Sequence, residues 1–326
     1  MTSPSLEPGL PLVTAVGLCY NHEQYVRDCL EGIKRQTYPN LEIIIADDCS
    51  RDSSPLLIQE WIKQNPSLPV TFVRNEQNRG VCATLNRVLT LARGKYISMT
   101  ATDDIWEPGK ILEQVRAMES LPETMGVLYS DAYLMDEAGK PLSKRFIETY
   151  RRFDHMPDGD IHALLWEGNF IPAMTTFIRR SVFDKVGWYD EELSYEDWDM
   201  WLRISEHYHF AYFPRPTARY RVSMYSMSKT SVDKMTLADE LIFIKFLLRK
   251  RVPKQVRNQA FNFAVRRAYR QKAATPTESK QLLNTLLRLY KSPRLLYAWM
   301  LYVLGFEYRH YESTIRAIKK IAQPAR

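Results

Sequence analysis

Two adjacent carboxylates, Asp103 and Asp104, give the clearest chemical signal in this 326-residue sequence. They follow a short β-prone run that ends near Met99, and they precede a helix start at Pro108. Mg²⁺ and Mn²⁺ are usually held by one or two carboxylates, while phosphate oxygens and water complete the octahedron. Paired acids at a strand end therefore suit a metal–diphosphate site better than a metal cage made of protein alone. The competing interpretation is a solvated turn or a helix cap.

A second acidic stretch lies downstream, at residues 194–204 (SYEDWDMWLRI). We expect Ser194 to cap a helix whose first turn carries Glu196, Asp197 and Asp199. Acids are common in a first helical turn for dipole reasons alone. The same field keeps a carboxylate ionised, so Asp197 is a candidate general base if it faces a cleft.

Strands and helices alternate through the first 100 residues, and this alternation predicts a parallel, three-layer α/β sheet. In such sheets, ligands bind beyond the carboxyl ends of the strands. Polar clusters follow three of the expected strands, so we expect them to line one crevice. The expected strands are 12–19, 41–46, 70–74 and 95–99, with helices after 23, at 55–64 and at 81–92, and the clusters are Asp47/Asp48, Asn78 to Gly80 and Asp103/Asp104.

The next hundred residues are less regular. We expect a helix at 108–120, a strand at 126–130 with a hairpin turn at 136–139, a surface loop at 145–160, a helix at 161–166 and a strand at 173–178. Neither G-x-G-x-x-G nor G-x-x-x-x-G-K-[ST] follows a strand, so the dinucleotide and P-loop fingerprints are absent. A bound diphosphate would therefore need the metal.

The last third of the chain changes in character at about residue 234. Strands cease, and four or five basic helical segments follow, with breaks at Pro253, Pro276 and Pro293. Residues 295–306 (LLYAWMLYVLGF) are apolar on almost every face but are too few to span a bilayer. This segment could pack on the rest of the chain, form a homodimer contact, or make a peripheral membrane contact through 291–320.

Composition narrows the class of protein. The chain is 45% hydrophobic and 25% charged, which is ordinary for a folded, soluble protein, and its formal net charge of +7 favours an anionic partner. Nucleic acid is not expected as that partner, because the basic residues alternate with helix-periodic apolar ones rather than gathering with exposed aromatic residues.

The cysteines and the N-terminus indicate the compartment. Cys19, Cys29, Cys49 and Cys82 form no C-x-x-C pair and no zinc spacing with histidine, so we expect buried thiols in a reducing compartment. The start of the chain lacks the basic and apolar regions of a secretory signal. We therefore predict a cytoplasmic protein that is free to attach peripherally to the inner face of the cell membrane.

Four motifs occur in order within residues 11–215. They are VGLCYNHEQYVRDCLEGIKRQTYPNLEIIIADDCSRDSS, NRGVCATLN, ARGKYISMTATDDIWEPGK and YEDWDMWLR. Together they resemble the family 2 glycosyltransferases of the GT-A fold, a Rossmann-like three-layer sandwich of nucleotide-diphospho-sugar transferases. The resemblance covers residues 11–215 and does not extend to the helical last third. With the change in character of the chain, we expect a lead at 1–10, a catalytic domain at 11–230 and a helical C-terminal region at 231–326 that makes acceptor, membrane-surface or oligomer contacts.

The resemblance also implies an inverting hexosyltransferase that moves a sugar from a nucleotide-diphosphate donor to a glycan or lipid-linked acceptor, with Mn²⁺ or Mg²⁺ as cofactor. The resemblance places such a transfer in cell-surface polysaccharide or lipopolysaccharide synthesis. In the donor site, Tyr20 and Asp48 would contact the nucleobase, and Asp48 would accept a base N–H. Asn78 and Gly80 would lie beside the donor.

For the chemistry itself, the resemblance implies that Asp104 binds the metal and that Asp103 lies at the ribose or the metal. Asp197 would deprotonate the acceptor hydroxyl, with Glu196 beside it. Many relatives carry an acid where this chain has Ala101, which leaves the role of Asp103 less defined. Two alternatives stay open, a nucleotidyltransferase and a non-catalytic nucleotide-sugar binding module.

Overall fold

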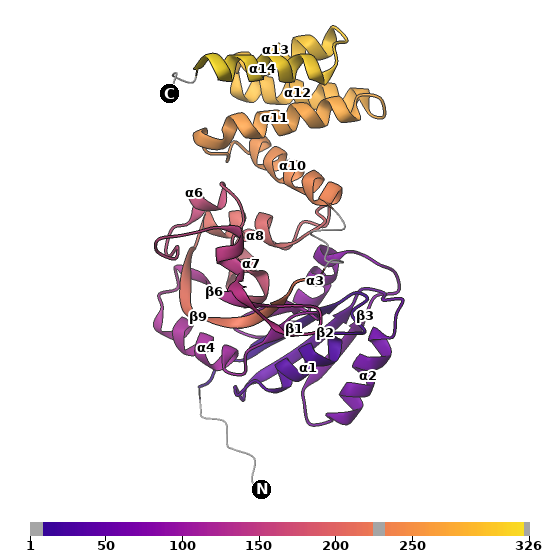
Figure 1. Cartoon of the computed structure of the whole chain (residues 1–326), viewed down its shortest axis with the longest axis vertical. Coiled ribbons are helices and arrows are strands. Elements are labelled where there is room, and N and C mark those ends of the chain that lie inside the picture. The colour runs from indigo at the N-terminus through magenta and orange to yellow at the C-terminus, as the bar shows by residue number, and fades with distance from the viewer. Residues whose placement is uncertain (1–8, 224–231, 323–326) are drawn as a thin grey trace. The chain divides into compact units, whose positions relative to one another are not determined.

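The computed structural model describes residues 9–223 and 232–322, which form two compact units, one up to Val232 and one from Asp233 (Figure 1). Three features expected from the sequence fall partly outside the described residues. Most of the lead at 1–10 and the domain boundary at 230/231 lie outside, as do the side chains of residues 318–320 in the expected membrane contact.

The first unit contains a nine-stranded mixed sheet in its described part, with the order β3-β2-β1-β4-β8-β6-β9-β5 and with β7 paired to β6. Strands β3, β2, β1 and β4 are parallel, as predicted, whereas β8 runs antiparallel to both β4 and β6. The strands are β1 (Val13–Cys19), β2 (Leu41–Asp47), β3 (Val70–Arg74), β4 (Tyr96–Ala101), β5 (Ile105–Trp106), β6 (Met125–Met135), β7 (Pro141–Arg145), β8 (Phe177–Arg179) and β9 (His209–Arg221).

Helices cover the sheet (Figure 1). Helix α1 turns Val26, Cys29, Leu30 and Ile33 towards the core, and the central strands β1 and β2 are buried along nearly their whole length because both faces are covered. The helical elements of this unit are α1 (Val26–Lys34), α2 (Ser54–Gln64), α3 (Val81–Leu89), α4 (Lys110–Ser120), α5 (Phe146–Tyr150), α6 (His162–Leu165), the 3₁₀ turn η1 (Ala173–Thr175), α7 (Ser181–Val186) and α8 (Asp197–Ser205).

Strand β9 was not anticipated from the sequence, although it spans 13 residues. Its two prolines, Pro214 and Pro216, argue against a strand because proline cannot donate to a ladder. The pairing with β6 shifts at this point, from Phe213 opposite Ser130 to Ala218 opposite Ala132. The prolines therefore occupy an irregularity where no ladder N–H is needed, and the strand continues beyond them.

Two local expectations were wrong. The segment expected as a loop at 145–160 begins with helix α5, which is fixed by an Arg145 N–H bond to Glu148 Oε1 (2.7 Å) and an Ile147 N–H bond to Asp131 Oδ1 (2.9 Å). Helix α8 starts at Asp197 and has Glu196, not Ser194, at its N-cap.

The second unit consists of helices, and their breaks fall at the prolines that the sequence indicated. Proline precedes or opens three of them because the first helical turn needs no N–H donor there. Within the described residues, no helix has both the length and the apolar character needed to cross a membrane. The helices are α10 (Val232–Leu248), α11 (Lys254–Gln271), α12 (Pro276–Tyr290), α13 (Pro293–Val303) and α14 (Tyr308–Ala322).

Candidate active site

The carboxyl ends of three parallel strands meet at one edge of the sheet. Cys19 at the end of β1 lies opposite Asp47 at the end of β2, and Leu18 lies opposite Ala101 at the end of β4. The loops that follow these strands are therefore neighbours. They bring together the acidic clusters that are about 50 residues apart in the sequence, as the α/β pattern predicts.

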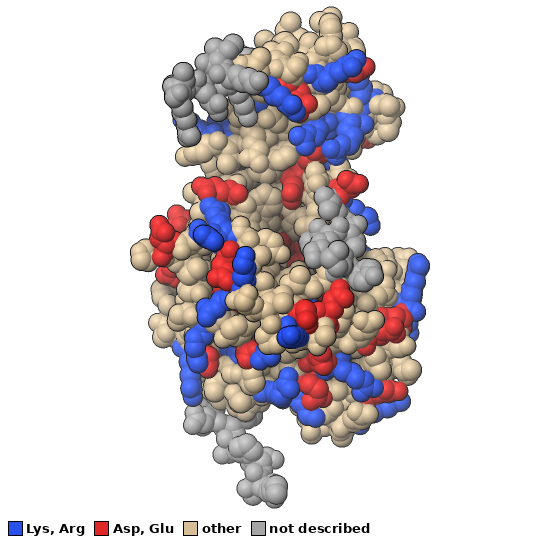
Figure 2. All heavy atoms as spheres, in the orientation of Figure 1, with Lys and Arg blue, Asp and Glu red and all other residues tan. Residues whose placement is uncertain are grey.

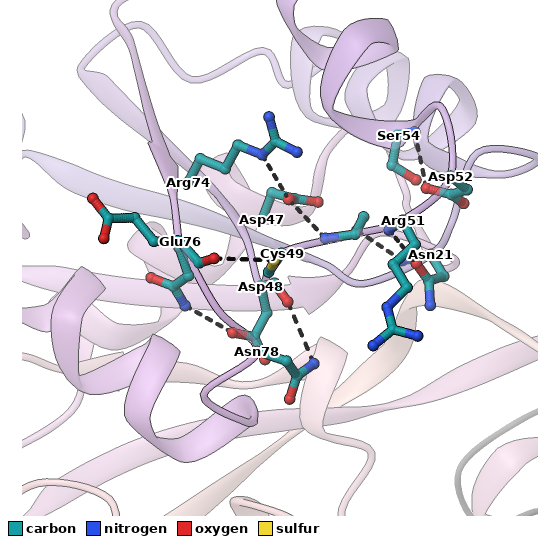
Figure 3. A network of polar contacts seen from close by, with 12 residues as sticks. Asn21, Asp47, Asp48, Cys49, Arg51, Asp52, Ser54, Arg74, Glu76 and Asn78 are labelled. Atoms are coloured by element: carbon teal, nitrogen blue, oxygen red, sulfur yellow. Dashed lines mark hydrogen bonds and ion pairs between the residues drawn. The ribbon is translucent and has the colours of Figure 1, made fainter.

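The loops after β1 and β2 are tied to each other by reciprocal hydrogen bonds (Figure 3). The Asn21 N–H donates to Ser50 Oγ, and the Arg51 N–H donates to Asn21 Oδ1, both at 2.9 Å. Asn21 has a left-handed backbone (φ 57°), which asparagine tolerates better than most residues. Tyr20, just before this turn, keeps 42% of its surface exposed, so its ring is available to a ligand.

Asp48 is buried, and its carboxylate is held by the start of α3. Oδ1 accepts hydrogen bonds from the Arg79 N–H and Asn75 Nδ2, and Oδ2 accepts one from the Gly80 N–H, all at 2.8 Å. Asn78 Nδ2 donates to the Asp48 carbonyl at 3.3 Å. Since a carboxylate offers about four acceptor positions, Asp48 retains one, on Oδ2, for a ligand N–H.

The residues on either side of Asp48 complete this loop (Figure 3). Asp47 is fully buried; its Oδ1 accepts the Ser50 N–H, while its Oδ2 has no partner among the described residues. Cys49 is half-buried rather than buried as expected, and it adopts a left-handed backbone (φ 62°). Its thiol donates to the Glu76 carbonyl at 3.4 Å.

Asp103 and Asp104 occupy different environments although they are adjacent. Asp103 is partly exposed, and its Oδ2 lies 3.9 Å from His22 Nε2, whose Nδ1 is 2.9 Å from Thr102 Oγ1. Asp104 is buried, and its Oδ1 accepts the Arg221 N–H at 2.9 Å. Burial, followed by the charge of Asp103, raises the pKa of Asp104 well above its usual range.

Arg221 was not identified from the sequence, because it lies in no motif and on the unpredicted strand β9. Its side chain is buried and donates from Nε to the Asp103 carbonyl (2.9 Å) and from Nη1 to the Glu137 carbonyl (2.9 Å). The guanidinium also lies 4.5 Å from the centre of the Tyr25 ring. Arg221 thus fixes the acidic turn through backbone contacts and leaves both carboxylates without a bidentate arginine partner.

The acidic turn fits a divalent cation that shares its ligands with a phosphate. Among the described residues, no three His, Cys, Asp or Glu side chains are grouped as a complete metal site. The Arg221 N–H engages only Oδ1 of Asp104, and the mutual repulsion of Asp103 and Asp104 would be relieved by a positive charge between them. This set of donors matches the one or two carboxylates by which Mg²⁺ or Mn²⁺ is usually held.

Asp197 opens helix α8, and its carboxylate receives N–H donors. Oδ2 accepts from Asn169 Nδ2 at 2.7 Å, and Oδ1 accepts from the Trp198 N–H at 2.6 Å. Such donors, together with the helix N-terminus, favour an ionised carboxylate. Asn169 lies in an irregular segment after α6 and is a second functional candidate that no sequence motif indicated.

The segment that carries Asp197 is anchored to the carboxyl edge of the sheet. Cys82, in the first turn of α3, donates to the Tyr195 carbonyl at 3.5 Å. Asn86 donates to the Tyr189 carbonyl at 2.9 Å, and the Tyr189 hydroxyl lies 3.7 Å from Met99 Sδ on β4. Asp197 therefore lies near the same end of α3 that holds Asp48.

Glu196 differs from its neighbour in charge. Burial, followed by the negative charge of Asp197, raises the pKa of Glu196 to about 8. At neutral pH this raised pKa favours the protonated form of Glu196. Environments that separate two carboxyls in this way are typical of sites where the two groups have different tasks.

The comparisons with known proteins agree with this geometry. The family model described as Glycosyl transferase family 2 matches residues 15–187. An uncharacterised glycosyltransferase of Methanocaldococcus jannaschii is 27% identical over 215 residues, which cover 65% of this chain and 71% of the relative. The putative teichuronic acid biosynthesis glycosyltransferase TuaG of Bacillus subtilis is 28% identical over 170 residues, 52% of this chain and 63% of TuaG.

Solved structures share the fold at low sequence identity. S. aureus TarS 1–349 in complex with UDP-GlcNAc superposes with a TM-score of 0.58 at 16% identity, covering 91% of this chain and 93% of that one. The mannosyltransferase PcManGT from Pyrobaculum calidifontis, in complex with GDP-Man and Mn²⁺, superposes with a TM-score of 0.56 at 17% identity. The match covers 91% of this chain and 85% of PcManGT.

The mixed sheet, with its acidic clusters at the carboxyl edge, has the GT-A fold, as predicted. Because the family model covers more than half of the sequence, the chain belongs to glycosyl transferase family 2.

Proposed function

We propose that this chain transfers a sugar from a nucleotide-diphosphate donor to an acceptor hydroxyl, with inversion of the anomeric centre and with Asp197 as general base. The observation that carries the proposal is the pair Glu196–Asp197: one carboxyl has its pKa raised to about 8, and the other is oriented by two N–H donors. The UDP-GlcNAc and GDP-Man complexes of TarS and PcManGT support a nucleotide-sugar donor.

In this proposal the nucleobase lies against Tyr20, and the one acceptor position left on Asp48 takes a base N–H. The donors that fill the other positions of Asp48 come from the turn before α3, so the turn that carries Asn78 and Gly80 orients the carboxylate before the donor arrives. Because this carboxylate is already ordered, donor binding costs less side-chain entropy there.

Asp103 and Asp104 would hold Mn²⁺ or Mg²⁺, with Asp103 as the more accessible carboxylate. When bound, such a cation stabilises the negative charge that grows on the diphosphate leaving group. The Arg221 N–H orients Asp104 through Oδ1. His22, bonded to Thr102, limits the positions that Asp103 can adopt.

Asp197 takes the proton of the acceptor hydroxyl as that oxygen attacks the sugar. Asn169 and the Trp198 N–H hold its carboxylate in one orientation, so little reorganisation is needed at the moment of reaction. Glu196 in its protonated form adds no second charge beside the base. A single displacement of this kind inverts the anomeric centre.

The acceptor is proposed to be a glycan or a lipid-linked glycan in cell-surface polysaccharide or lipopolysaccharide synthesis, a setting supported by the name of TuaG. We further predict a cytoplasmic location with peripheral attachment at the inner face of the cell membrane, and a homodimer through the C-terminal helices. The chain spans 58% of the length of an uncharacterised Mycobacterium tuberculosis protein to which it is 33% identical over 219 residues.

The test combines donor binding with turnover. Thermal stability is measured with UDP, GDP, dTDP and CDP, each with Mn²⁺ and with EDTA, because a ligand of the native state raises its stability by mass action. Donor hydrolysis or transfer is then measured for Asp197→Asn and for Asp184→Asn, an exposed acid on α7 that serves as a matched control. We expect Asp197→Asn to keep donor binding and lose about 100-fold or more in turnover.

Near-normal turnover of Asp197→Asn would remove the assignment of the base. Absence of a metal-dependent shift with every nucleotide would instead favour a family member that keeps the fold without its transfer chemistry.

A further inference from the structure

The two units of the chain differ in charge. Residues 233–326 contain 20 lysines and arginines but six acids, a formal charge of +14, whereas residues 1–232 contain 25 against 32, a charge of −7. Figure 2 shows lysine and arginine side chains over the helices of the second unit, with acidic side chains beside some of them. The basic character that suggested an anionic partner therefore belongs to the helical unit rather than to the donor site.

This unit contains a cavity of about 400 Å³ at the end of α11 and the connection between α13 and α14. Three cations line it, Arg266, Arg270 and Lys272, against one acid, Glu307, which pairs with Arg309 at 2.9 Å. The remaining lining residues are Tyr269, Gly305, Phe306 and Tyr308. A basic cavity with aromatic walls is suited to a phosphate that carries an organic group.

The cations are held in place from within the unit. Glu240 is fully buried, and its carboxylate lies 3.1 Å from Arg270 Nη1 and 3.8 Å from Arg266 Nη1. Both arginines still expose part of their side chains, 38% for Arg266 and 45% for Arg270. Because each guanidinium has five N–H donors, donors remain after Glu240 is satisfied.

Lys272 supplies a third positive charge. Its Nζ donates to the Tyr302 carbonyl at 3.0 Å and lies 4.6 Å from the centre of the Tyr302 ring. In the part of the chain that the structure describes, no carboxylate lies within ion-pair distance of Lys272. The cavity therefore keeps a net positive charge even when Glu240 is counted, and its cations are already oriented.

An apolar ridge adjoins this cavity. It is formed by exposed side chains of α13 and the residues after it: Leu296, Met300, Val303, Leu304 and Phe306. Leu304 exposes 68% of its surface, and no charged residue interrupts the sequence between Arg294 and Glu307. Phe306 belongs to both the apolar ridge and the cavity, so the two surfaces are continuous. Contiguous exposed apolar surface of this kind marks an interaction site.

We propose that the helical unit binds an anionic phospholipid of a membrane surface, with the head-group phosphate in the Arg266–Arg270–Lys272 cavity and the apolar ridge in the acyl region. This deepens the membrane contact considered for residues 291–320 by naming the ligand class and the residues that bind it. A second copy of the chain fits the ridge less well, because a symmetric contact would bring two positive cavities together. The proposal does not depend on the transfer reaction.

The experiment measures cosedimentation of the full chain with vesicles, without nucleotide or metal. Vesicles of phosphatidylcholine alone are compared with vesicles that also contain phosphatidylglycerol. We expect binding to the anionic vesicles only, weakened about fivefold in Lys272→Gln and about tenfold in Leu304→Ser. Two matched controls should bind normally: Lys280→Gln, an exposed lysine of α12, and Leu56→Ser, an exposed leucine of α2.

Three results would overturn the proposal. The first is an absence of binding to anionic vesicles, and the second is an equal loss in Lys272→Gln and Lys280→Gln, which would indicate diffuse attraction without a cavity. The third is dissociation of a dimer by Leu304→Ser in gel filtration, since the apolar ridge would then serve a second copy. Thermal unfolding checks that each variant is folded. Normal donor binding in the same preparations would show that the catalytic proposal stands independently of this result.

Discussion

Replacing Asn169 tests whether this side chain positions the proposed base. Asn169 makes two contacts that can be separated: Nδ2 donates to Asp197 Oδ2 at 2.7 Å, and Oδ1 accepts the Ile171 N–H at 3.0 Å. Asn169→Ala removes both contacts. Asn169→Asp keeps the acceptor for Ile171 but replaces the donor with a second negative charge.

The magnitude follows from the kind of bond that is lost. A hydrogen bond to a charged group contributes about 1.5 to 3 kcal/mol, which corresponds to roughly a 10- to 100-fold change in rate. The Trp198 N–H still holds the other oxygen of Asp197, so Asn169→Ala should lower kcat by about tenfold. Asn169→Asp should lower kcat further, because the added charge acts directly on the base.

The pH profile separates positioning from structure. The Nδ2 donor favours the ionised form of Asp197, so its removal should move the acidic limb of kcat/KM to higher pH, further in Asn169→Asp than in Asn169→Ala. The control is Asn65→Ala on the end of α2, which also loses a side-chain hydrogen bond, the 2.8 Å contact with the Trp61 carbonyl. If the acidic limb does not move, or if Asn65→Ala lowers kcat equally, Asn169 acts only through the fold.

Two further predictions follow from pKa shifts. Above about pH 8, ionisation of Glu196 adds a negative charge beside Asp197. The KM for the anionic donor should therefore rise with pH in the wild type and stay constant in Glu196→Gln. Parallel rises in both proteins would refute the idea that the charge of Glu196 affects donor binding. Burial lowers the pKa of Lys110 in the folded protein well below 10.5, its usual value. Between the lowered pKa and pH 10.5, the unfolded chain binds more protons than the folded one, so the stability of the fold should increase with pH. Urea unfolding at successive pH values should show this increase in the wild type and a smaller one in Lys110→Met, and equal slopes would contradict it.

The parallel half of the sheet could be predicted because its signals are local. Strands β1, β2 and β4 are buried on both faces and appear as unbroken apolar runs, and a polar cluster follows the carboxyl ends of β2 and β4. That regularity also predicted that Asp48 and Asp103 would lie at the same edge. The helix breaks at Pro253, Pro276 and Pro293 could be predicted for a similar reason, since proline restricts the backbone conformation and removes an N–H donor wherever it occurs.

The second half of the sheet depends on partners that are distant in sequence. Strand β9 carries two prolines in an irregularity that only its pairing with β6 makes acceptable, so its own residues gave no strand signal. Arg221 and Asn169 acquire their roles from contacts with Asp104 and Asp197, which are 117 and 28 residues away. No spacing rule connects such pairs, and for this reason the sequence indicated the acids but not the residues that orient them.

The cysteines provide a means of observing the donor site. Burial raises the pKa of Cys19 to about 11 and also raises the pKa values of Cys29 and Cys82, so these thiols are neither accessible nor ionised near neutral pH. Cys49 is the half-buried exception, and it directly follows Asp48. We therefore expect a maleimide fluorophore to attach to Cys49 in the native protein, and its emission to change on addition of nucleotide if the proposed donor site at Asp48 is correct.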